Sequence, residues 1–478
     1  MGNLNGTTRL SRRRILGALA ATGVIPALAA CGGLAPASKP AEPTKPPAPA
    51  PAATTAPAAA ATTAPAAAAT PAQAAPAAKG VEIQVATRGG SDGEIMEKSV
   101  VDFAKETGIQ AKHVAYGGEP EYWAKVQSLH ATKQVADVIW ASVGNLHNFA
   151  NRGLLAELDP LIKADNYDLG DYVPNGLKTC SLNGKLYAMP WGGHPGNGGL
   201  LYNTDLLEKE GIKPPDASWT LDTLMDAAKK LTKQSGGRVE QFGFAVGTDF
   251  LSLNNIVGGF GGDFLSPDGK QLQLDDAKVK QGLNYVRDLF VTVKASPVPG
   301  PDVNTGNLFA SGKVALLHTG YWGHFSPGEK AIAGKFKWGL DLIPKGPAGK
   351  MGTSLTINGQ TISSISTKQK EAWLFLKWLM EPKNHIPIVL SGGSRPALRN
   401  SVLDNKDLNE KLIAHKRFVE AIKTAEPWKM PHNYRWPEFN TTISQVFADV
   451  WTGKQTVDEA IPEAKKKLQA VLDKPAID

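Results

Sequence analysis

Strand-like and helix-like segments alternate from residue 81 onward, and this alternation most limits the folds open to the chain. Residues 81–86 alternate polar and apolar side chains, which predicts a strand. Residues 91–107 follow with an apolar helical face and Gly108 as the stop, and a second strand is expected at 110–114. A helix at 121–131 and a buried strand at 136–140 repeat the pattern. Such alternation predicts an α/β fold with mainly parallel sheets.

The length of this region sets the number of domains. About 400 residues follow residue 80, which is too many for one hydrophobic core and enough for two domains. Further along, Thr220 is expected to cap a helix ending at residue 231, with Trp219 packing back onto Leu224. Another helix is expected at 371–380, where Pro382 follows its end.

The charge of the chain is concentrated near its beginning. The formal net charge is +7, and seven basic residues precede residue 80: Arg9, Arg12, Arg13, Arg14, Lys39, Lys45 and Lys79. The rest of the chain is therefore close to neutral, so its charge gives no support to binding of nucleic acid.

The first thirty residues have the pattern of an export signal. Arginines at 12–14 precede an apolar stretch, 15–30, that ends in small side chains. Residues 11–16 (SRRRIL) resemble a twin-arginine signal, and residues 28–31 (LAAC) resemble the lipobox of bacterial lipoproteins. The stretch is shorter than the roughly 20 residues that cross a bilayer. We therefore expect cleavage and a lipid on Cys31, which leaves Cys180 without a disulfide partner, as either a buried apolar residue or a reactive thiol.

Residues 31–80 are predicted to be the lipidated cysteine and a disordered tether. Of the 48 residues from 32 to 79, 22 are Ala and 11 are Pro. A segment of this composition cannot bury enough apolar surface to fold, and its prolines favour extended backbone. We expect it to anchor the folded region at the outer side of the cell membrane.

The sequence lacks the local motifs of the main hydrolase and nucleotide-binding classes. It contains no His-Glu-x-x-His motif, no Gly-x-Ser-x-Gly elbow, no paired-cysteine zinc spacing and no Walker loop. The nine histidines are dispersed, and His385 and His415 are expected at the surface. We therefore expect no enzyme activity, no cofactor and no metal site. A polysaccharide hydrolase stays an alternative, because distant carboxylates can pair in space as an acid and a nucleophile.

Four sequence blocks occur in one order across the chain: DVIW (137–140) with FANRGLLAEL (149–158), GKLYAMP (184–190) with LYNTDLL (201–207), GKVA (312–315) with GYW (320–322), and GKQTVDEA (453–460). Together they resemble the extracellular solute-binding proteins, family 1, of carbohydrate ABC transporters, the maltose-binding-protein-like family. The resemblance spans essentially all of the region after the tether.

This resemblance implies a periplasmic-binding-protein-like fold, in which a hinge of several chain crossings joins two α/β lobes around a ligand cleft. We place the first lobe at 81–191 plus 357–394 and the second at 192–356 plus 395–478. The implied function is to bind a sugar or oligosaccharide outside the cytoplasm and to deliver it, by hinge closure, to ABC permease subunits. We expect a monomer. A polyamine or an organic anion is the alternative ligand on the same fold.

The candidate site residues follow from the chemistry of sugars, which present flat CH faces and a rim of hydroxyl groups. Trp140 ends an apolar strand, where open α/β sheets bind ligands, and it is interpreted either as a ligand-site residue or as a core tryptophan. Ser142 and Asn145 continue into the same loop and either bond hydroxyl groups or cap the next helix. Trp191 and His194 lie in a glycine-rich crossing, WGGHPGNGG. That crossing is not expected to bind phosphate, because a strand-like segment follows it.

The resemblance supplies four of the other candidates. It assigns the aromatic wall of the pocket to Trp322, and it places Asp249, Phe250 and Asn254 in a ligand loop. Arg395 is interpreted either as a donor to paired hydroxyl groups or a carboxylate, or as part of a surface ion pair. Trp436 is expected to close the cleft from the second lobe. Glu119 and Tyr122, which follow the second strand, complete the set.

Overall fold

The computed structural model describes residues 80–477 except for short gaps at 326–327, 329 and 393–394. The predicted export signal, the tether and Cys31 lie outside these residues, as does the side chain of Glu119. Within the described part of the chain, no helix has both the length and the apolar composition needed to cross a membrane.

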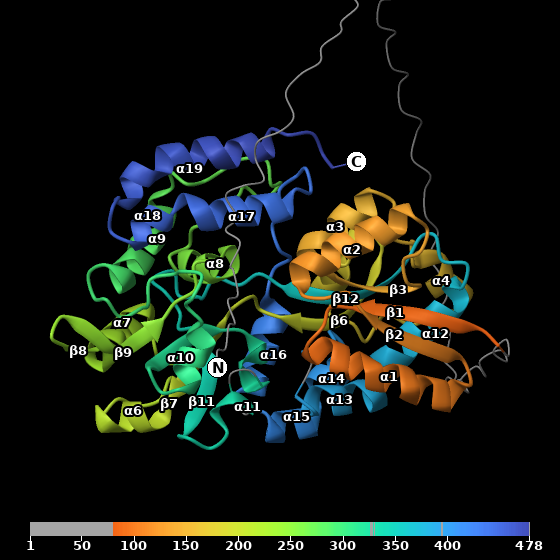
Figure 1. The fold of residues 1–478 in the computed structure, drawn as a ribbon, viewed down its shortest axis with the longest axis horizontal. Helices are drawn as coiled ribbons and strands as arrows, with labels where there is room; N and C mark the ends of the chain where they lie inside the picture. Colours follow the sequence, from red (N-terminus) through yellow and green to blue (C-terminus); the bar gives the residue numbers. More distant parts are fainter. Residues whose placement is uncertain (1–79, 326–327, 329, 393–394, 478) are drawn as a thin grey trace, which may run out of the picture. The chain divides into compact units, whose positions relative to one another are not determined.

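A five-stranded sheet organises the first lobe (Figure 1), with strand order β2-β1-β3-β12-β6. The pairs β1–β2 and β1–β3 are parallel, whereas β12 runs antiparallel to both β3 and β6. A short β4–β5 hairpin lies outside this sheet. The strand bounds are β1 (Glu82–Thr87), β2 (Gln110–Ala115), β3 (Val138–Ser142), β4 (Ser181–Leu182), β5 (Lys185–Leu186), β6 (Ala188–His194) and β12 (Thr356–Ile362).

Helices from two separate stretches of sequence belong to this lobe, and the last of them contacts strands of both sheets. They are α1 (Ser91–Thr107), α2 (Glu119–Ala131), α3 (Val143–Asn151), α4 (Asp159–Ala164), α5 (Pro174–Thr179), α12 (Gln369–Met380), α13 (Pro382–Leu390), α14 (Asn400–Leu403), α15 (Lys406–Lys411) and α16 (His415–Thr424). The buried core of this lobe includes Leu398, Val402 and Ile422, which lie beyond residue 394, where we expected the second part of the lobe to end.

A second five-stranded sheet, of order β11-β7-β10-β9-β8, organises the second lobe. Its strands are β7 (Gly199–Asn203), β8 (Lys233–Ser235), β9 (Arg238–Ala245), β10 (Val314–Thr319) and β11 (Trp338–Leu342). Its helices are α6 (Thr204–Lys209), α7 (Leu221–Leu231), α8 (Phe250–Gly259), α9 (Ala277–Phe290), α10 (Thr305–Ala310), η1 (Tyr321–His324), α11 (Lys330–Ile332), α17 (Trp436–Val446), α18 (Ala448–Trp451) and α19 (Val457–Leu472). In Figure 1, α17 and α19 lie side by side, and residues of both helices belong to one buried core.

Local sequence signals account for several element ends. Gly108 ends α1 with a φ of 76°, a left-handed conformation that glycine adopts without strain. The hydroxyl of Thr220 accepts from the backbone N–H of Thr223 and caps α7. Thr456 and Glu459 form a capping box at the start of α19. The two sheets, each with its own buried core, confirm the two α/β lobes predicted from the sequence.

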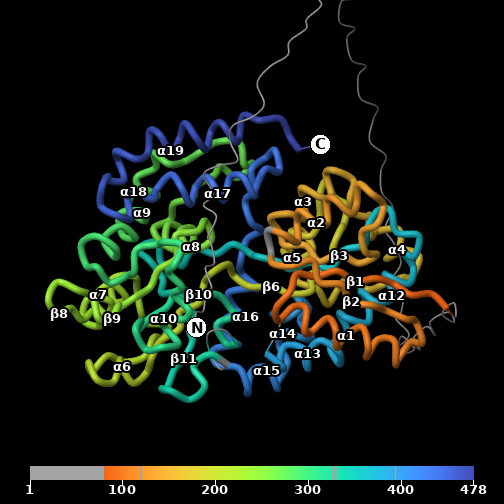
Figure 2. Tube along the Cα trace, viewed as in Figure 1, coloured from red at the N-terminus to blue at the C-terminus, as the bar shows by residue number. Residues whose placement is uncertain are grey.

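The chain passes between the two sheets more than once, as the trace in Figure 2 shows. One passage joins β6 to β7 through residues 195–198, and another joins β11 to β12 through residues 343–355. Leu355 in the second passage forms a parallel bridge with Pro427. Several short connections of this kind let two compact halves keep a common hinge.

The expectation of mainly parallel sheets is wrong, because both sheets are mixed. In the second lobe β9–β10 is parallel, whereas β7–β10, β7–β11 and β8–β9 are antiparallel. The reason is that β7, β11 and β12 belong to the passages between lobes, and a strand that arrives from the other lobe need not follow the βα crossover that makes neighbours parallel.

The expected surface positions of His385 and His415 are also wrong, since both side chains are buried. His385 accepts at Nε2 from the backbone N–H of Ala397, 2.9 Å away. The Nε2 atom of His415 lies 3.0 Å from the carbonyl oxygen of Leu403, and its Nδ1 atom lies 2.7 Å from the Tyr321 hydroxyl. Both imidazoles therefore satisfy buried backbone or hydroxyl groups. Cys180 is also buried, in the first core.

Candidate functional site

A cavity of about 740 Å³ has walls from both lobes, and we refer to it as the interlobe pocket. The first lobe contributes Arg88, Trp123, Trp140, Ser142, Gly144, Asn145, His194, Thr356, Asn358 and Arg395, and the second contributes Asp249, Leu251, Trp322, Trp428, Trp436, Pro437, Asn440 and Thr441. Eight of the thirteen candidates from the sequence meet here: Trp140, Ser142, Asn145, His194, Asp249, Trp322, Arg395 and Trp436.

The topology of the first sheet brings these side chains to one edge. Arg88 directly follows β1, Ser142 ends β3 and His194 ends β6. Because β12 runs antiparallel to its neighbours, its first residue, Thr356, reaches the same edge. Carboxyl ends of strands gather at the ligand-binding edge of open α/β sheets.

A buried carboxylate holds two arginines in the pocket. Asp92, in the first turn of α1, is 1% exposed. Its Oδ2 atom lies 2.7 Å from Nε of Arg88, and its Oδ1 atom lies 3.6 Å from Nη1 of Arg395. Each guanidinium also lies over an indole, Arg88 at 4.6 Å from the ring centre of Trp140 and Arg395 at 5.6 Å from that of Trp322.

Trp140 lines the pocket without an open face. Its side chain is fully buried, and its ring stacks on that of Trp123, with 5.0 Å between ring centres and 22° between planes. Trp123 itself is only half-buried. The aromatic surface that we expected from Trp140 is therefore presented by Trp123, with Trp140 supporting it from within the lobe.

Trp322 lines the pocket from the second lobe, and its side chain is half-buried. The edge of its indole meets the ring of His194, with 5.1 Å between centres and 85° between planes. Its six-membered ring lies directly on Gly320, where an added Cβ atom would stand 2.1 Å from Cζ3. Only a glycine at position 320 allows the indole to lie this close to the backbone.

His194 is neutral in this setting. Burial, together with the positive charges of Arg395 and Arg88, lowers the pKa of His194 to about 3. Its Nδ1 atom lies 2.7 Å from the carbonyl oxygen of Gly196, and because a carbonyl only accepts, Nδ1 carries the proton. The Nε2 atom is then an acceptor for a ligand hydroxyl.

Planar polar groups occupy the rest of the walls. Asp249 caps α8 by accepting from the backbone N–H groups of Leu251 and Ser252, at 3.0 and 3.2 Å. Asn145 donates to the hydroxyl of Ser142 at 3.4 Å, so Ser142 stands at the N-cap of α3 without capping it through its side chain. The amide Nδ2 of Asn358 is buried without a hydrogen-bond partner. Amides and carboxylates of this kind suit ligand hydroxyl groups.

The other candidates lie away from the pocket. Trp191 is buried in the first core against His385, and Phe250 is buried in the second core. Tyr122 is buried, and its hydroxyl donates to the carbonyl oxygen of Trp140 at 2.9 Å. Asn254 donates to the hydroxyl of Ser354 at 3.0 Å and lines a different cavity. The side chain of Glu119 lies outside the described residues.

Several lining residues were missed in the sequence: Arg88, Trp123, Thr356, Asn358, Trp428, Asn440 and Thr441. A signal existed for Arg88, because it follows the first predicted strand directly, as Trp140 ends the third. Asn358 and Thr356 gave none, since β12 reaches this edge only through its long-range pairing with β3 and β6.

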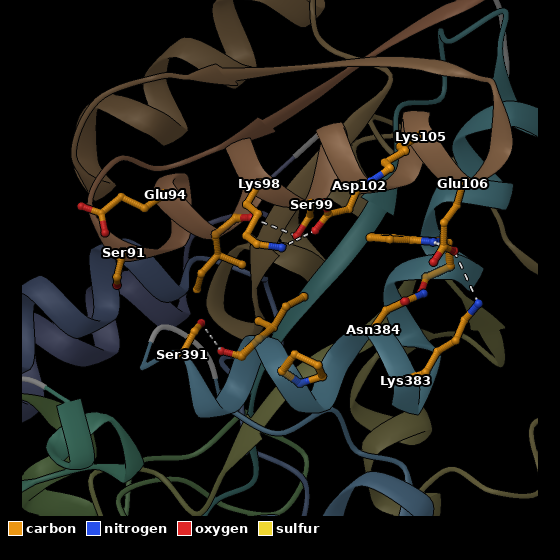
Figure 3. A pocket seen from close by; sticks show the side chains of 14 residues that line it. Ser91, Glu94, Lys98, Ser99, Asp102, Lys105, Glu106, Lys383, Asn384 and Ser391 are labelled. Atoms are coloured by element: carbon orange, nitrogen blue, oxygen red, sulfur yellow. Dashed lines mark hydrogen bonds and ion pairs between the residues drawn. The ribbon is translucent and has the colours of Figure 1, made fainter.

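A second cavity, of about 580 Å³, lies between α1 and α13 of the first lobe (Figure 3). Several of its charged side chains pair with one another, because Lys98 pairs with Asp102, and Lys383 lies 3.4 Å from Glu106. Its indole, Trp378, donates to Glu106 at 2.6 Å. Its amide, Asn384, donates to the carbonyl oxygen of Trp378 at 2.7 Å, so the indole and the amide of this groove both have partners within the protein. Among the described residues, no cluster of His, Cys, Asp and Glu is suited to a metal ion.

Comparison with known proteins identifies the family. A family model described as bacterial extracellular solute-binding protein matches residues 88–386, more than half of the chain. The arabinooligosaccharide-binding protein of Bacillus subtilis (strain 168) is 28% identical over 301 residues, which cover 59% of this chain and 65% of that protein.

Solved structures share the fold. A solute-binding protein of Agrobacterium vitis S4 with bound D-mannitol has a TM-score of 0.66 and 26% identity, covering 82% of this chain and 98% of that one. A solute-binding protein from Thermotoga lettingae TMO bound with α-D-tagatose has a TM-score of 0.71 at 23% identity, with 82% and 100% covered. The resemblance drawn from the sequence blocks is thus confirmed, and this chain belongs to the bacterial extracellular solute-binding protein family.

Proposed function

We propose that this protein is the extracytoplasmic receptor of an ABC importer and that it binds a neutral sugar, polyol or short oligosaccharide in the interlobe pocket. The observation that carries the proposal is the composition of the walls. Half-buried indoles, Trp123 and Trp322, come from the two lobes, and Asn145, Asn358 and the neutral His194 surround them. Aromatic platforms suit the CH faces of a ring, and planar polar groups suit its hydroxyl rim.

The relatives support the same class of ligand. The similar Bacillus subtilis protein binds an arabinooligosaccharide by its name, and the similar Agrobacterium vitis structure holds D-mannitol. Both ligands are neutral and rich in hydroxyl groups, which matches a pocket whose two arginines, Arg88 and Arg395, are paired with the buried Asp92 behind them.

Delivery to the permease is proposed to depend on hinge closure. The lobes touch beside the pocket, where the indole of Trp436 lies against Gly144. Asn148 donates to the carbonyl oxygen of Tyr434 at 3.3 Å, and Asn151 donates to that of Ile477 at 2.7 Å. A ligand that contacts both lobes would stabilise this closed arrangement, which the permease subunits would then recognise. The proposal includes a lipid on Cys31 as the anchor at the membrane, a monomeric state and the absence of enzyme activity.

The alternative ligands differ in charge. A polyamine is disfavoured, because Arg88 and Arg395 line the pocket and would repel it. An organic anion is the alternative that those arginines favour. A polysaccharide hydrolase would need a pair of carboxylates facing the ligand, whereas the pocket walls contain one, Asp249, among the described residues.

The proposal is tested by titration calorimetry of the purified protein with D-mannitol, D-tagatose, glucose, arabinotriose, maltotriose, citrate and spermidine. At least one neutral carbohydrate is expected to bind saturably, with a micromolar or lower Kd. Chromatography of the same mixtures should show no new product. Binding of citrate or spermidine alone would replace the proposed ligand class, and turnover of an oligosaccharide would replace the proposed function.

Removal of the Trp322 indole should weaken binding strongly. Large aromatic side chains at the centre of a contact contribute about 2 kcal/mol or more, which corresponds to a roughly thirtyfold higher Kd for Trp322→Ala. Trp338→Ala is the matched control, because Trp338 is a half-buried indole of the same lobe that does not line the pocket. Equal affinities for the wild type and Trp322→Ala, with the melting temperature unchanged, would remove Trp322 from the ligand site.

A further inference from the structure

The interlobe pocket has two arginines in its walls and a carboxylate behind them. Arg88 and Arg395 line the pocket, and 24% and 13% of their side-chain surfaces are exposed. Asp92 does not line the pocket, and its side chain is 2% exposed. A bound ligand therefore meets the guanidinium groups and not the carboxylate, so Asp92 acts on a ligand only through its charge and through the arginines.

Asp92 holds both arginines from one place. It is the second residue of α1, where the positive end of the helix dipole favours a carboxylate. Its Oδ2 atom lies 2.7 Å from Nε of Arg88, and its Oδ1 atom lies 3.6 Å from Nη1 of Arg395. Arg88 directly follows β1, whereas Arg395 lies between α13 and α14, so one carboxylate fixes side chains from two distant segments.

The Asp92 carboxylate also changes the charge of the site. Among the described residues that line the pocket, the charged ones are Arg88, Arg395 and Asp249, because His194 is neutral. Two positive charges and one negative charge leave an excess of one positive charge, and Asp92 cancels it from behind the wall. These charges therefore sum to zero, which suits a ligand without charge, whereas an excess of arginine would suit a carboxylate.

We propose that Asp92 is a positioning residue that makes the interlobe pocket select neutral sugars and polyols against their acids. It orients the guanidinium groups of Arg88 and Arg395 toward itself, and its negative charge repels a ligand carboxylate that approaches them. The acids in question carry a carboxylate in place of a terminal CH₂OH group. This inference rests on the proposed function and names the residue that decides between a neutral ligand and an organic anion.

The expected size of the effect follows from Coulomb's law. A ligand carboxylate on the outer side of either guanidinium would stand about 8 Å from that of Asp92, and at an effective dielectric constant of about 20 the repulsion lowers affinity roughly thirtyfold. Salt screens part of this repulsion, because the two arginines are partly exposed. A change of at least about tenfold is therefore expected at physiological ionic strength.

Calorimetry with matched pairs of ligands tests the proposal. Each neutral ligand of the panel that binds is compared with its acid, for example D-mannitol with D-mannonate and glucose with glucuronate. The selectivity is the Kd of the acid divided by the Kd of the neutral ligand. It should be at least about 10 for the wild type and at least about tenfold lower for Asp92→Asn, which keeps the shape of the side chain and removes its charge.

Three further variants separate the effect of charge from an effect on structure. Asp92→Glu keeps the charge and should retain the wild-type selectivity within about threefold. Asp92→Asn combined with Arg395→Gln removes one charge of each sign and should also recover it, which a merely distorted pocket would not. Asp102→Asn is the matched control and should leave the selectivity unchanged, because Asp102 lies on α1 but outside the pocket. Thermal unfolding of each free variant shows whether it is folded.

The outcomes separate this inference from the proposed function. If the wild type binds an acid as tightly as its neutral counterpart, only this inference is overturned, and that result needs no variant. An unchanged selectivity in Asp92→Asn, or a selectivity in the double variant as low as in Asp92→Asn, also overturns it. If Asp92→Asn does not fold, the wild-type comparison and the double variant carry the test. If no neutral ligand of the panel binds, the proposed function fails and the inference fails with it.

Discussion

Replacing Gly144 by alanine would place a methyl group where the two lobes touch. An added Cβ atom at Gly144 would stand 2.2 Å from Cδ1 and 2.5 Å from Nε1 of the Trp436 indole. Ordinary contacts of a Cβ atom begin at about 3.4 Å. The indole is itself held by Trp428, at 4.4 Å between ring centres, and by Phe250, at 4.8 Å, so it cannot move aside cheaply.

The overlap must therefore be relieved by separating the lobes. Overpacking of this size costs about 1–3 kcal/mol. If the ligand is bound by the closed arrangement, that cost appears in the binding equilibrium, as a Kd about 5- to 150-fold higher. The fold itself should not suffer, because Gly144 lies in α3 and alanine favours a helix over glycine by about 1 kcal/mol. Affinity and stability should thus change in opposite directions.

Calorimetry with the best ligand gives the Kd, and thermal unfolding of the free protein gives the stability. Gly89→Ala is the matched control, since an added Cβ atom there meets nothing closer than the carbonyl oxygen of Gly117, at 3.6 Å. Small-angle scattering of Gly144→Ala should show a larger radius of gyration than the wild type in the presence of ligand. An unchanged Kd in Gly144→Ala would refute the idea that ligand binding requires the lobes to meet at Trp436.

Two further predictions concern buried groups. Burial lowers the pKa of His385 to about 4, whereas its pKa in the unfolded chain is about 6.5. Between pH 6.5 and pH 4 the unfolded chain therefore binds a proton that the folded chain does not. The free energy of unfolding should fall as the pH is lowered through this range. Denaturant unfolding at pH 7.5, 6, 5 and 4 should show this loss, at about 3 kcal/mol for the full shift. His385→Gln should lose less on acidification, and an equal loss would assign the effect to the other buried histidines. The thiol of Cys180 is fully buried, and burial raises its pKa. It should therefore react with a thiol reagent only after the protein unfolds. Fast labelling of the native protein, detected by mass spectrometry on tryptic peptides, would contradict its buried position.

Elements with local sequence signals were predictable from the sequence. The helix predicted at 91–107 has those bounds as α1, and Gly108 ends it as expected, because an apolar face and a left-handed glycine are both visible in a single stretch of sequence. The direction of β12 was not predictable in this way. Its place between β3 and β6 depends on pairing across more than 160 residues of sequence, which no periodicity records.

The residues of the candidate site were likewise predictable only where a local sequence signal exists. Loops that follow strands pointed to Trp140, Ser142 and His194, but a loop setting does not tell which way a side chain faces. Trp191 and His194 lie three residues apart on β6, so they point to opposite faces, and Trp191 enters the core while His194 reaches the pocket.

Neighbouring residues on one helix also point in different directions, which a single stretch of sequence does not assign to the core or the pocket. Successive residues of a helix point about 100° apart, so Tyr122 is buried in the core whereas Trp123, the next residue of α2, lines the pocket. Fully buried strands such as β6 carry no alternation that would have settled the choice from sequence.

A crystal structure of the protein with its tightest carbohydrate ligand from the calorimetric panel tests the central claim most directly. The claim predicts ligand density in the interlobe pocket, with a ring against Trp322 or Trp123 and hydroxyl groups bonded to Asn358 and His194. Density in the groove between α1 and α13 instead, or a ligand bound through Arg88 and Arg395 alone and away from the indoles, would contradict it.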